Sequence, residues 1–120
     1  MQIQERSVGD IVVLAVSGEI TLDEGCRFFL KERVRSLIGQ GQLRLLIDLK
    51  DVSRVDSAGL GELVQVSYVA SKNAGGSLKL VSLTDGLKEL LRSTRLNTVF
   101  EICDNAEAGI ASFSSSSLKP

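Results

Sequence analysis

The segment from residue 43 to residue 73 constrains the fold most strongly, because its hydrophobic pattern changes part-way along. Residues 43–49 read Leu-Arg-Leu-Leu-Ile-Asp-Leu, a nearly continuous apolar run that is typical of a strand covered on both faces. From Leu60 onward, apolar residues recur at intervals of three and four, as in a helix that packs on a sheet. A buried strand that leads directly into such a helix predicts an α/β sandwich.

The junction between this strand and this helix lies near Asp56 and Ser57. Both residue types are good helix N-caps, because their side-chain oxygens accept backbone N–H groups that the first helical turn leaves unpaired. The positive end of the helix dipole also favours an anion near the Ser57 hydroxyl. We interpret Gly59 and Gly61 as positions where the lack of a side chain lets another molecule approach Ser57. From these residues alone, a structural cap is the simpler interpretation and a modified serine is the second one.

The remaining segments predict strands and helices in alternation after an initial hairpin. Strands are expected at residues 2–8, 11–16, 77–83 and 99–102, and the other helices begin near Thr21 or Asp23, Thr84 or Asp85, and Asp104 or Asn105. This order predicts one domain, residues 1–112, with a mixed sheet of four to five strands packed with about four helices. The last helix is expected to end at Ala111. Residues 113–120 are rich in serine and are expected to form a flexible tail.

The composition argues against several classes of function. The 14 Lys and Arg residues nearly cancel the 15 Asp and Glu residues, and the net charge of −1 without a basic block argues against nucleic-acid binding. No apolar stretch approaches the ~20 residues that cross a bilayer, so we expect no membrane association and a cytoplasmic location. The absence of histidine makes zinc catalysis and Ser-His hydrolysis poor fits. Cys26 and Cys103 fit buried thiols better than a metal site, and a disulfide between them stays open.

The hexapeptide Asp56-Ser57-Ala58-Gly59-Leu60-Gly61 resembles the Asp-Ser-Ser/Thr/Ala-Gly-Leu-Gly signature of the STAS domain, in particular of bacterial anti-sigma factor antagonists. Three further segments resemble the family in the same order along the chain. They are the end of the second strand at residues 16–20, the helix-to-strand turn at residues 73–80, and the third helix with the approach to the last strand at residues 87–100. Together they cover most of residues 1–110, so the resemblance implies the STAS fold for the predicted domain.

The resemblance implies a switch between partners that is controlled by phosphorylation. In the family, the unphosphorylated antagonist binds an anti-sigma factor of the histidine-kinase-like ATPase fold and thereby frees a sigma factor. That anti-sigma factor is also a serine kinase, and it phosphorylates the first serine of the signature, which is Ser57 here. A metal-dependent serine phosphatase of the PP2C type restores binding. The domain is then the substrate of both reactions and needs no catalytic residue, metal or cofactor of its own.

The same resemblance implies partner contacts at two segments that follow the ends of central strands. The expected partner-binding residues are Thr21, Asp23, Asp56, Ser57, Ala58, Gly59 and Leu60. Thr21 departs from the family, which commonly has an aspartate after Gly-Glu-Leu/Ile, and Asp23 is the nearby acid that could substitute for it. Ala58 replaces a second serine often found in the signature, which leaves Ser57 as the acceptor. We expect a monomer or a weak homodimer.

Two other classes of function stay open. STAS domains also serve as non-phosphorylated scaffolds or as regulatory subunits, for example of lipid transporters. An enzyme is the least favoured class, because only carboxylates or lysines such as Asp23, Asp56 and Lys50 are available as a base for Ser57. A phosphate on Ser57 would add a charge of about −1.5 to −2. We expect this charge to obstruct the interface locally rather than to refold the domain.

Overall fold

A computed structural model describes residues 2–21, 29–72 and 76–118 of the chain, with side chains described up to Phe113. Within these ranges the order is strand, strand, helix, strand, helix, strand, helix, strand, helix, as the hydrophobic pattern predicts. The elements are β1 (Gln2–Val8), β2 (Ile11–Ile20), α1 (Phe29–Gly39), β3 (Arg44–Val55), α2 (Ser57–Ser71), β4 (Ser77–Val81), α3 (Asp85–Ser93), a short 3-10 helix (Leu96–Thr98), β5 (Glu101–Cys103) and α4 (Ala106–Leu118).

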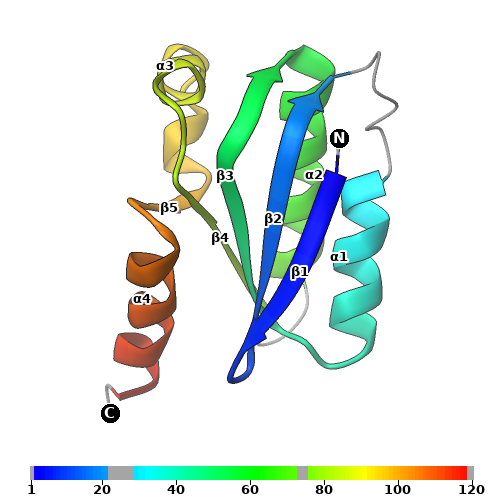
Figure 1. Cartoon of the computed structure of the whole chain (residues 1–120), viewed down its shortest axis with the longest axis vertical. Helices are drawn as coiled ribbons and strands as arrows, with labels where there is room; N and C mark the ends of the chain where they lie inside the picture. The colour runs from blue at the N-terminus through cyan, green and yellow to red at the C-terminus, as the bar shows by residue number, and fades with distance from the viewer. Residues whose placement is uncertain (1, 22–28, 73–75, 119–120) are drawn as a thin grey trace.

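The strands form one mixed sheet in the order β1-β2-β3-β4-β5. β1 and β2 are antiparallel and are joined by a tight turn in which Gly9 adopts a φ of +62°, a conformation that favours glycine. The other neighbouring strands are parallel, and a helix connects β2 to β3 and β3 to β4. Figure 1 shows α1 and α2 on one side of the sheet and α4 on the other. The α/β fold with a five-stranded mixed sheet confirms the prediction.

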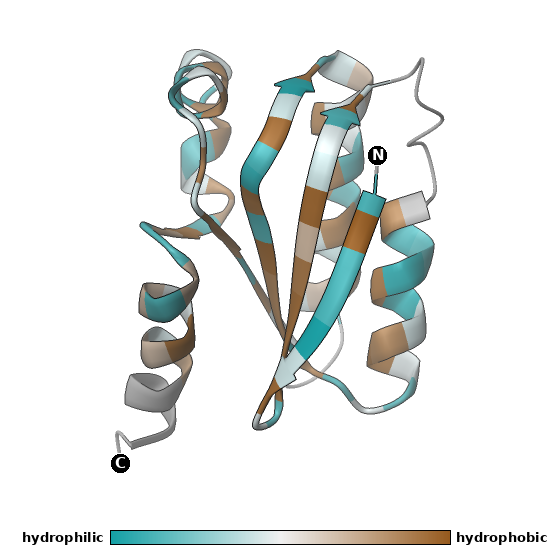
Figure 2. Ribbon diagram, in the orientation of Figure 1, coloured by the Kyte–Doolittle hydropathy of each residue, from teal (hydrophilic) through white to brown (hydrophobic). Residues whose placement is uncertain are grey.

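The central strands β2 and β3 are apolar on both faces, as their sequences indicate (Figure 2). On one face, Val12, Leu14 and Val16 of β2 join the main core with the inward residues of α1, α2 and α3. On the other face, Ile11 and Val13 join a smaller core. Alternate residues of a strand point to opposite faces, so the continuous apolar run of β2 supplies both cores at once.

Helix α4 covers the smaller core and is longer than the sequence indicated. Asn105 Oδ1 accepts the N–H of Ala108 at 2.8 Å and caps the helix, and Phe113 is buried against the sheet. The Lys79 ammonium, which is also buried, donates to Ser112 Oγ at 2.6 Å and lies 4.4 Å from the centre of the Phe113 ring. The end expected at Ala111 was wrong, because serine costs a helix well under 1 kcal/mol per residue and does not terminate one. The division of the chain at residues 112 and 113 stays a prediction.

The bounds of several strands also differ from the hydrophobic pattern. β2 continues to Ile20, as the resemblance implies, beyond the apolar run that ends at Val16, and β3 continues to Val55, beyond the apolar run that ends at Leu49. β4 ends at Val81 instead of residue 83, because Ser82 adopts a φ of +59°, and β5 spans Glu101–Cys103 instead of residues 99–102. The polar outer halves of β2 and β3 pair with each other, with register shifts that indicate β-bulges after Ala15 and Gly18. The inner halves are recognised by an apolar run, which polar residues and bulges interrupt in the outer halves, so the hydrophobic pattern alone does not reveal the outer halves.

Candidate functional site at the start of helix α2

The outer halves of β2 and β3 bring the two predicted partner-binding segments to one end of the sheet. Glu19 pairs with Arg54 and Ile20 with Val55 in the parallel register, and the Arg54 Nε lies 3.7 Å from a Glu19 carboxylate oxygen. Thr21 therefore leaves the sheet beside Asp56. Sites of open α/β sheets gather where strands lead into helix N-termini, and this end of the sheet fits that rule.

Asp56, and not Ser57, caps helix α2. Asp56 has extended backbone angles, φ −95° and ψ −175°, and its Oδ1 accepts the N–H of Gly59 at 2.8 Å. Ser57 is the first helical residue and is exposed. The choice that the sequence left open is thus decided by geometry. The Ser57 hydroxyl lies at the positive end of the helix dipole but does not cap the helix.

Gly59 permits a close contact between α2 and the end of β2. A Cβ built on Gly59 would lie 1.8 Å from the carbonyl oxygen of Ile20 and 2.7 Å from its carbonyl carbon. The first turn of α2 therefore touches the end of β2 through the bare backbone of Gly59. Packing alone accounts for this glycine, and its role in the approach of a partner stays a prediction. A Cβ at Gly61 meets nothing within 4 Å, and this glycine is exposed.

The expected partner-binding residues differ in their exposure. Ser57 is exposed, Asp56 and Ala58 are half-buried, and Gly59 and Leu60 are buried. Thr21 is fully buried, and its Oγ1 has no hydrogen-bond partner within the described ranges. The Thr21 side chain thus has no exposed surface in this conformation, and its contact with a partner stays a prediction. Asp23 and Cys26 lie outside the described residues.

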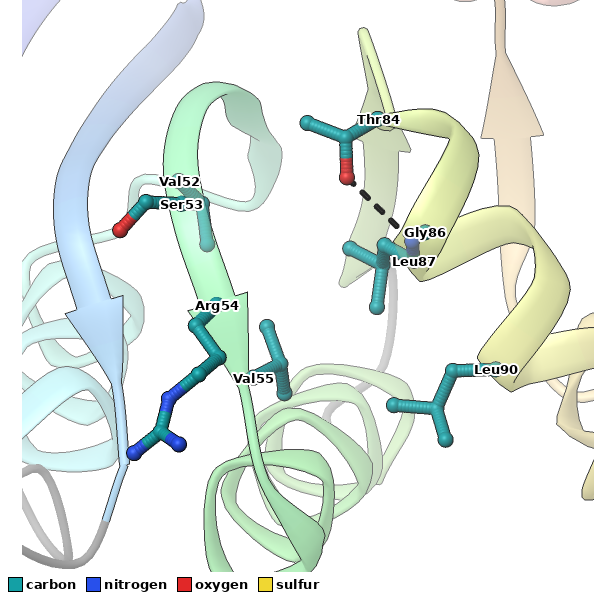
Figure 3. Close-up of a pocket in the computed structure, with 8 residues that line it drawn as sticks. All are labelled: Val52, Ser53, Arg54, Val55, Thr84, Gly86, Leu87 and Leu90. Atoms are coloured by element: carbon teal, nitrogen blue, oxygen red, sulfur yellow. Dashed lines mark hydrogen bonds between the residues drawn. The ribbon is translucent and has the colours of Figure 1, made fainter.

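A cavity of about 290 Å³ adjoins the site between β3 and α3 (Figure 3). It opens because β4 pairs with β3 only as far as Asp48, while β3 continues to Val55. Val55, Leu87 and Leu90 give it an apolar lining, and Thr84 caps α3 by accepting the N–H of Leu87 at 3.3 Å. No local sequence pattern indicates this cavity, because it depends on the unequal lengths of two neighbouring strands.

Comparison with known proteins agrees with this geometry. The anti-sigma-B factor antagonist of Bacillus subtilis (strain 168) is 41% identical over 81 residues, which are 68% of this chain and 72% of that protein. The sequence pattern of the STAS domain matches residues 2–109. This chain is a STAS domain protein of the anti-sigma factor antagonist family. The resemblance seen in the hexapeptide is confirmed.

Solved structures show the same STAS fold at low identity. RsbS of Moorella thermoacetica superimposes with a TM-score of 0.81 at 20% identity, over 99% of this chain and all of the compared one. The Bacillus cell fate determinant SpoIIAA in its phosphorylated form superimposes with a TM-score of 0.66 at 17% identity, over 89% of this chain and 96% of the other. STAS proteins of this family are regulatory and not enzymes.

Glu62 fixes the position of α2 against α1 in this STAS domain. Its side chain is only 5% exposed, and its Oε2 accepts the backbone N–H of Lys31 in the first turn of α1 at 2.9 Å. Burial raises the pKa of Glu62, and the hydrogen bond from Lys31 and the charge of Lys31 partly oppose this rise. Sequence reasoning missed this residue, although its position four residues before Val66 places it on the buried side of the helix.

The first turn of α2 can hold a negative charge near Ser57, because its backbone N–H groups form the positive end of the helix dipole. A phosphate on the Ser57 oxygen would gain about 0.3 to 1 kcal/mol from the helix dipole and would be repelled by Asp56. Within the described ranges, no group of three acidic or cysteine side chains could hold a metal ion. In the same ranges, no helix is long and apolar enough to span a bilayer.

Proposed function

We propose that this STAS protein is an anti-sigma factor antagonist controlled by phosphorylation of Ser57. The unphosphorylated form binds an anti-sigma factor that is also a serine kinase, and this binding frees a sigma factor. The kinase then phosphorylates Ser57, which ends the interaction, and a PP2C-type phosphatase restores it. The kinase depends on ATP, so we place the switch in the cytoplasm.

The position of Ser57 is the observation that carries the proposal. The hydroxyl is exposed at the first position of α2, while Asp56 performs the capping. Modification of Ser57 therefore removes no hydrogen bond on which the helix depends. SpoIIAA has been solved in a phosphorylated form, which supports the view that a domain of this fold tolerates the added group.

Local obstruction is the mechanism that we propose for the switch. A phosphate adds a charge of about −1.5 to −2 and three strong acceptor oxygens. An interface fitted around a bare hydroxyl has no room for this group, and desolvation of its charge is costly. The neighbouring Asp56 adds to the negative charge that a partner would have to accommodate. The free domain keeps its fold, because Ser57 faces solvent.

The first test locates the phosphate. The full chain is incubated with ATP and the anti-sigma factor kinase that co-purifies with its unmodified form, and the product is analysed by peptide mapping. We expect a single phosphate on Ser57. The variant Ser53→Ala, which alters another exposed serine near the end of β3, should be phosphorylated like the parent. A phosphate on Ser53 or in the serine-rich residues 114–117 with Ser57 unmodified would contradict the proposal.

The second test separates charge from size at Ser57. Ser57→Asp and Ser57→Asn add side chains of the same shape, but only the aspartate is charged. We expect Ser57→Asp to lose affinity for the anti-sigma factor, Ser57→Asn to lose less, and Ser57→Ala to bind as the parent does and to resist phosphorylation. Binding isotherms and melting curves measure these outcomes. Equal affinities of the aspartate variant and the parent would refute obstruction by charge.

A further inference from the structure

A groove of about 420 Å³ lies between α1 and α2, away from Ser57. Figure 1 shows these two helices side by side on one face of the sheet. The groove is centred near Tyr68, which follows Ser57 by 11 residues and lies about 16 Å farther along α2 at 1.5 Å per residue. It is therefore a surface distinct from the proposed phosphorylation site.

The floor of this groove is apolar. Val64 and Val69 of α2 are half-buried and pack on the main core from the groove side. Tyr68 lies between them in sequence and is 64% exposed, the most exposed of the large apolar side chains in the described ranges. A single exposed apolar residue is ordinary. Here, however, the tyrosine lies in a concave surface, where an aromatic ring can serve as an anchor for a partner.

The rim of the groove is positively charged. Lys31 and Arg35 line it from α1, Lys72 lines it from α2, and its lining contains no acidic residue, although the net charge of the chain is −1. The Lys31 ammonium donates to Gln65 Oε1 at 3.0 Å across the two helices, and the Lys72 ammonium lies 5.8 Å from the Tyr68 ring centre.

Arg35 has one acidic neighbour outside the lining of the groove. Its guanidinium lies 3.1 Å from a Glu32 oxygen, but both side chains are more than half exposed. An ion pair as exposed as this one holds its partners weakly.

We propose that this groove binds an acidic amphipathic helix of a partner protein. A helix laid along α1 and α2 would place an apolar stripe on Val64, Val69 and Tyr68, which is the helix-in-groove mode of recognition. Acidic residues on the flanks of that stripe would meet Lys31, Arg35 and Lys72. A concave surface between two helices fits a third helix better than it fits the flat surface of an anionic membrane. Binding here is independent of the state of Ser57.

The experiment uses two synthetic helical peptides with the same leucine stripe, one flanked by glutamates and the other by lysines. Fluorescence anisotropy measures their binding to the full chain, and amide chemical shifts locate the bound peptide. We expect the glutamate peptide to bind at least about tenfold more tightly than the lysine peptide and to shift the amides of Val64, Tyr68 and Val69. Tyr68→Ser should weaken its binding by about 30-fold, as loss of an aromatic anchor does.

Charge-reversed variants provide the matched control. Arg35→Glu with Lys72→Glu should weaken binding of the glutamate peptide at least about tenfold, because both substitutions place acids against acids. Lys88→Glu with Arg92→Glu on α3 changes the net charge equally at a distant surface and should have little effect. Ser57→Asp should bind the peptide like the parent, which separates this proposal from the phosphorylation switch.

Three outcomes would overturn the proposal. The first is equal binding of both peptides, and the second is an equal loss in the two charge-reversed variants. The third is binding to phosphatidylglycerol vesicles without binding to the glutamate peptide, which would identify a membrane-facing surface instead. Melting curves of each variant show whether it is folded, and these exposed substitutions are not expected to lower the melting temperature by more than a few degrees.

Discussion

Alanine substitutions at Gly59 and Gly61 should change stability in opposite directions, although both residues lie near the start of α2. Gly59 contacts the Ile20 carbonyl oxygen through its bare backbone, whereas Gly61 faces open space. Helix propensity alone would make both substitutions stabilising. The difference in stability between the two alanine variants therefore measures how much free energy a Cβ costs at the close contact between α2 and the end of β2.

The structure gives the size of each effect. A Cβ at Gly59 would stand 1.8 Å from the Ile20 oxygen, and ordinary contact begins at 3.4 Å, so the two backbones must separate by at least about 1.6 Å. Overpacking of this kind costs typically about 1 to 3 kcal/mol, and more where backbone must move. The gain in helix propensity offsets at most about 1 kcal/mol. We expect Gly59→Ala to destabilise by about 1 to 3 kcal/mol and Gly61→Ala to stabilise by about 0.5 to 1 kcal/mol.

Urea unfolding followed by circular dichroism measures both variants against the parent at 25 °C. The expected difference between the two alanine variants is about 1.5 to 4 kcal/mol, above the error of the method. Equal stabilities of Gly59→Ala and Gly61→Ala would show that α2 does not rest on the Ile20 carbonyl. Access for another molecule to Ser57, the role that the sequence suggested for Gly59, would then be the better explanation of this glycine.

The remaining predictions concern the stability that the N-cap of α2 and two buried charged side chains contribute. Asp56→Ala should cost about 0.5 to 2 kcal/mol in urea unfolding, and Ser57→Ala much less, because only Asp56 caps α2. Ser112→Ala should cost about 1 to 3 kcal/mol because it removes an acceptor of the buried Lys79 ammonium, whereas Lys79→Met should be nearly neutral. The pKa of Glu62 is raised above 4.5 in the folded state, so its contribution to stability is present below about pH 4.5 and is lost as the pH rises through the folded pKa. Glu62→Gln should therefore match the parent near pH 4 and exceed it at pH 7, by about 1.4 kcal/mol for each unit by which the pKa is raised.

The order of elements was predictable because each inner strand and helix carries its own hydrophobic period. The run at residues 43–49 and the three-and-four spacing after Leu60 come from local burial, which a sequence displays directly. The ends of the elements were not predictable in this way. The outer half of β3 is held by pairing with β2, and α4 extends through serines that neither favour nor end a helix strongly.

The sequence predicted where the candidate site lies, but not which residue caps α2 or which residues contact one another there. The motif identified Ser57 at the start of a helix, but either Asp56 or Ser57 could have been the cap on chemical grounds. Only the extended backbone of Asp56 and its bond to Gly59 decide between them. The role of Gly59 depends on Ile20, which lies 39 residues earlier in the chain, and no local pattern reveals a contact of that kind.

The start of α2 is fixed from three directions, and this bears on how the proposed switch would work. Asp56 holds the first turn, the Ile20 carbonyl rests against Gly59, and Glu62 ties the second turn to α1. Movement of the helix would disturb all three contacts together. A phosphate on the exposed Ser57 would disturb none of them. The added charge therefore acts at the surface, where a partner must contact it, and it does not move the helix. The rigid support of α2 thus favours local obstruction of the interface over a conformational change.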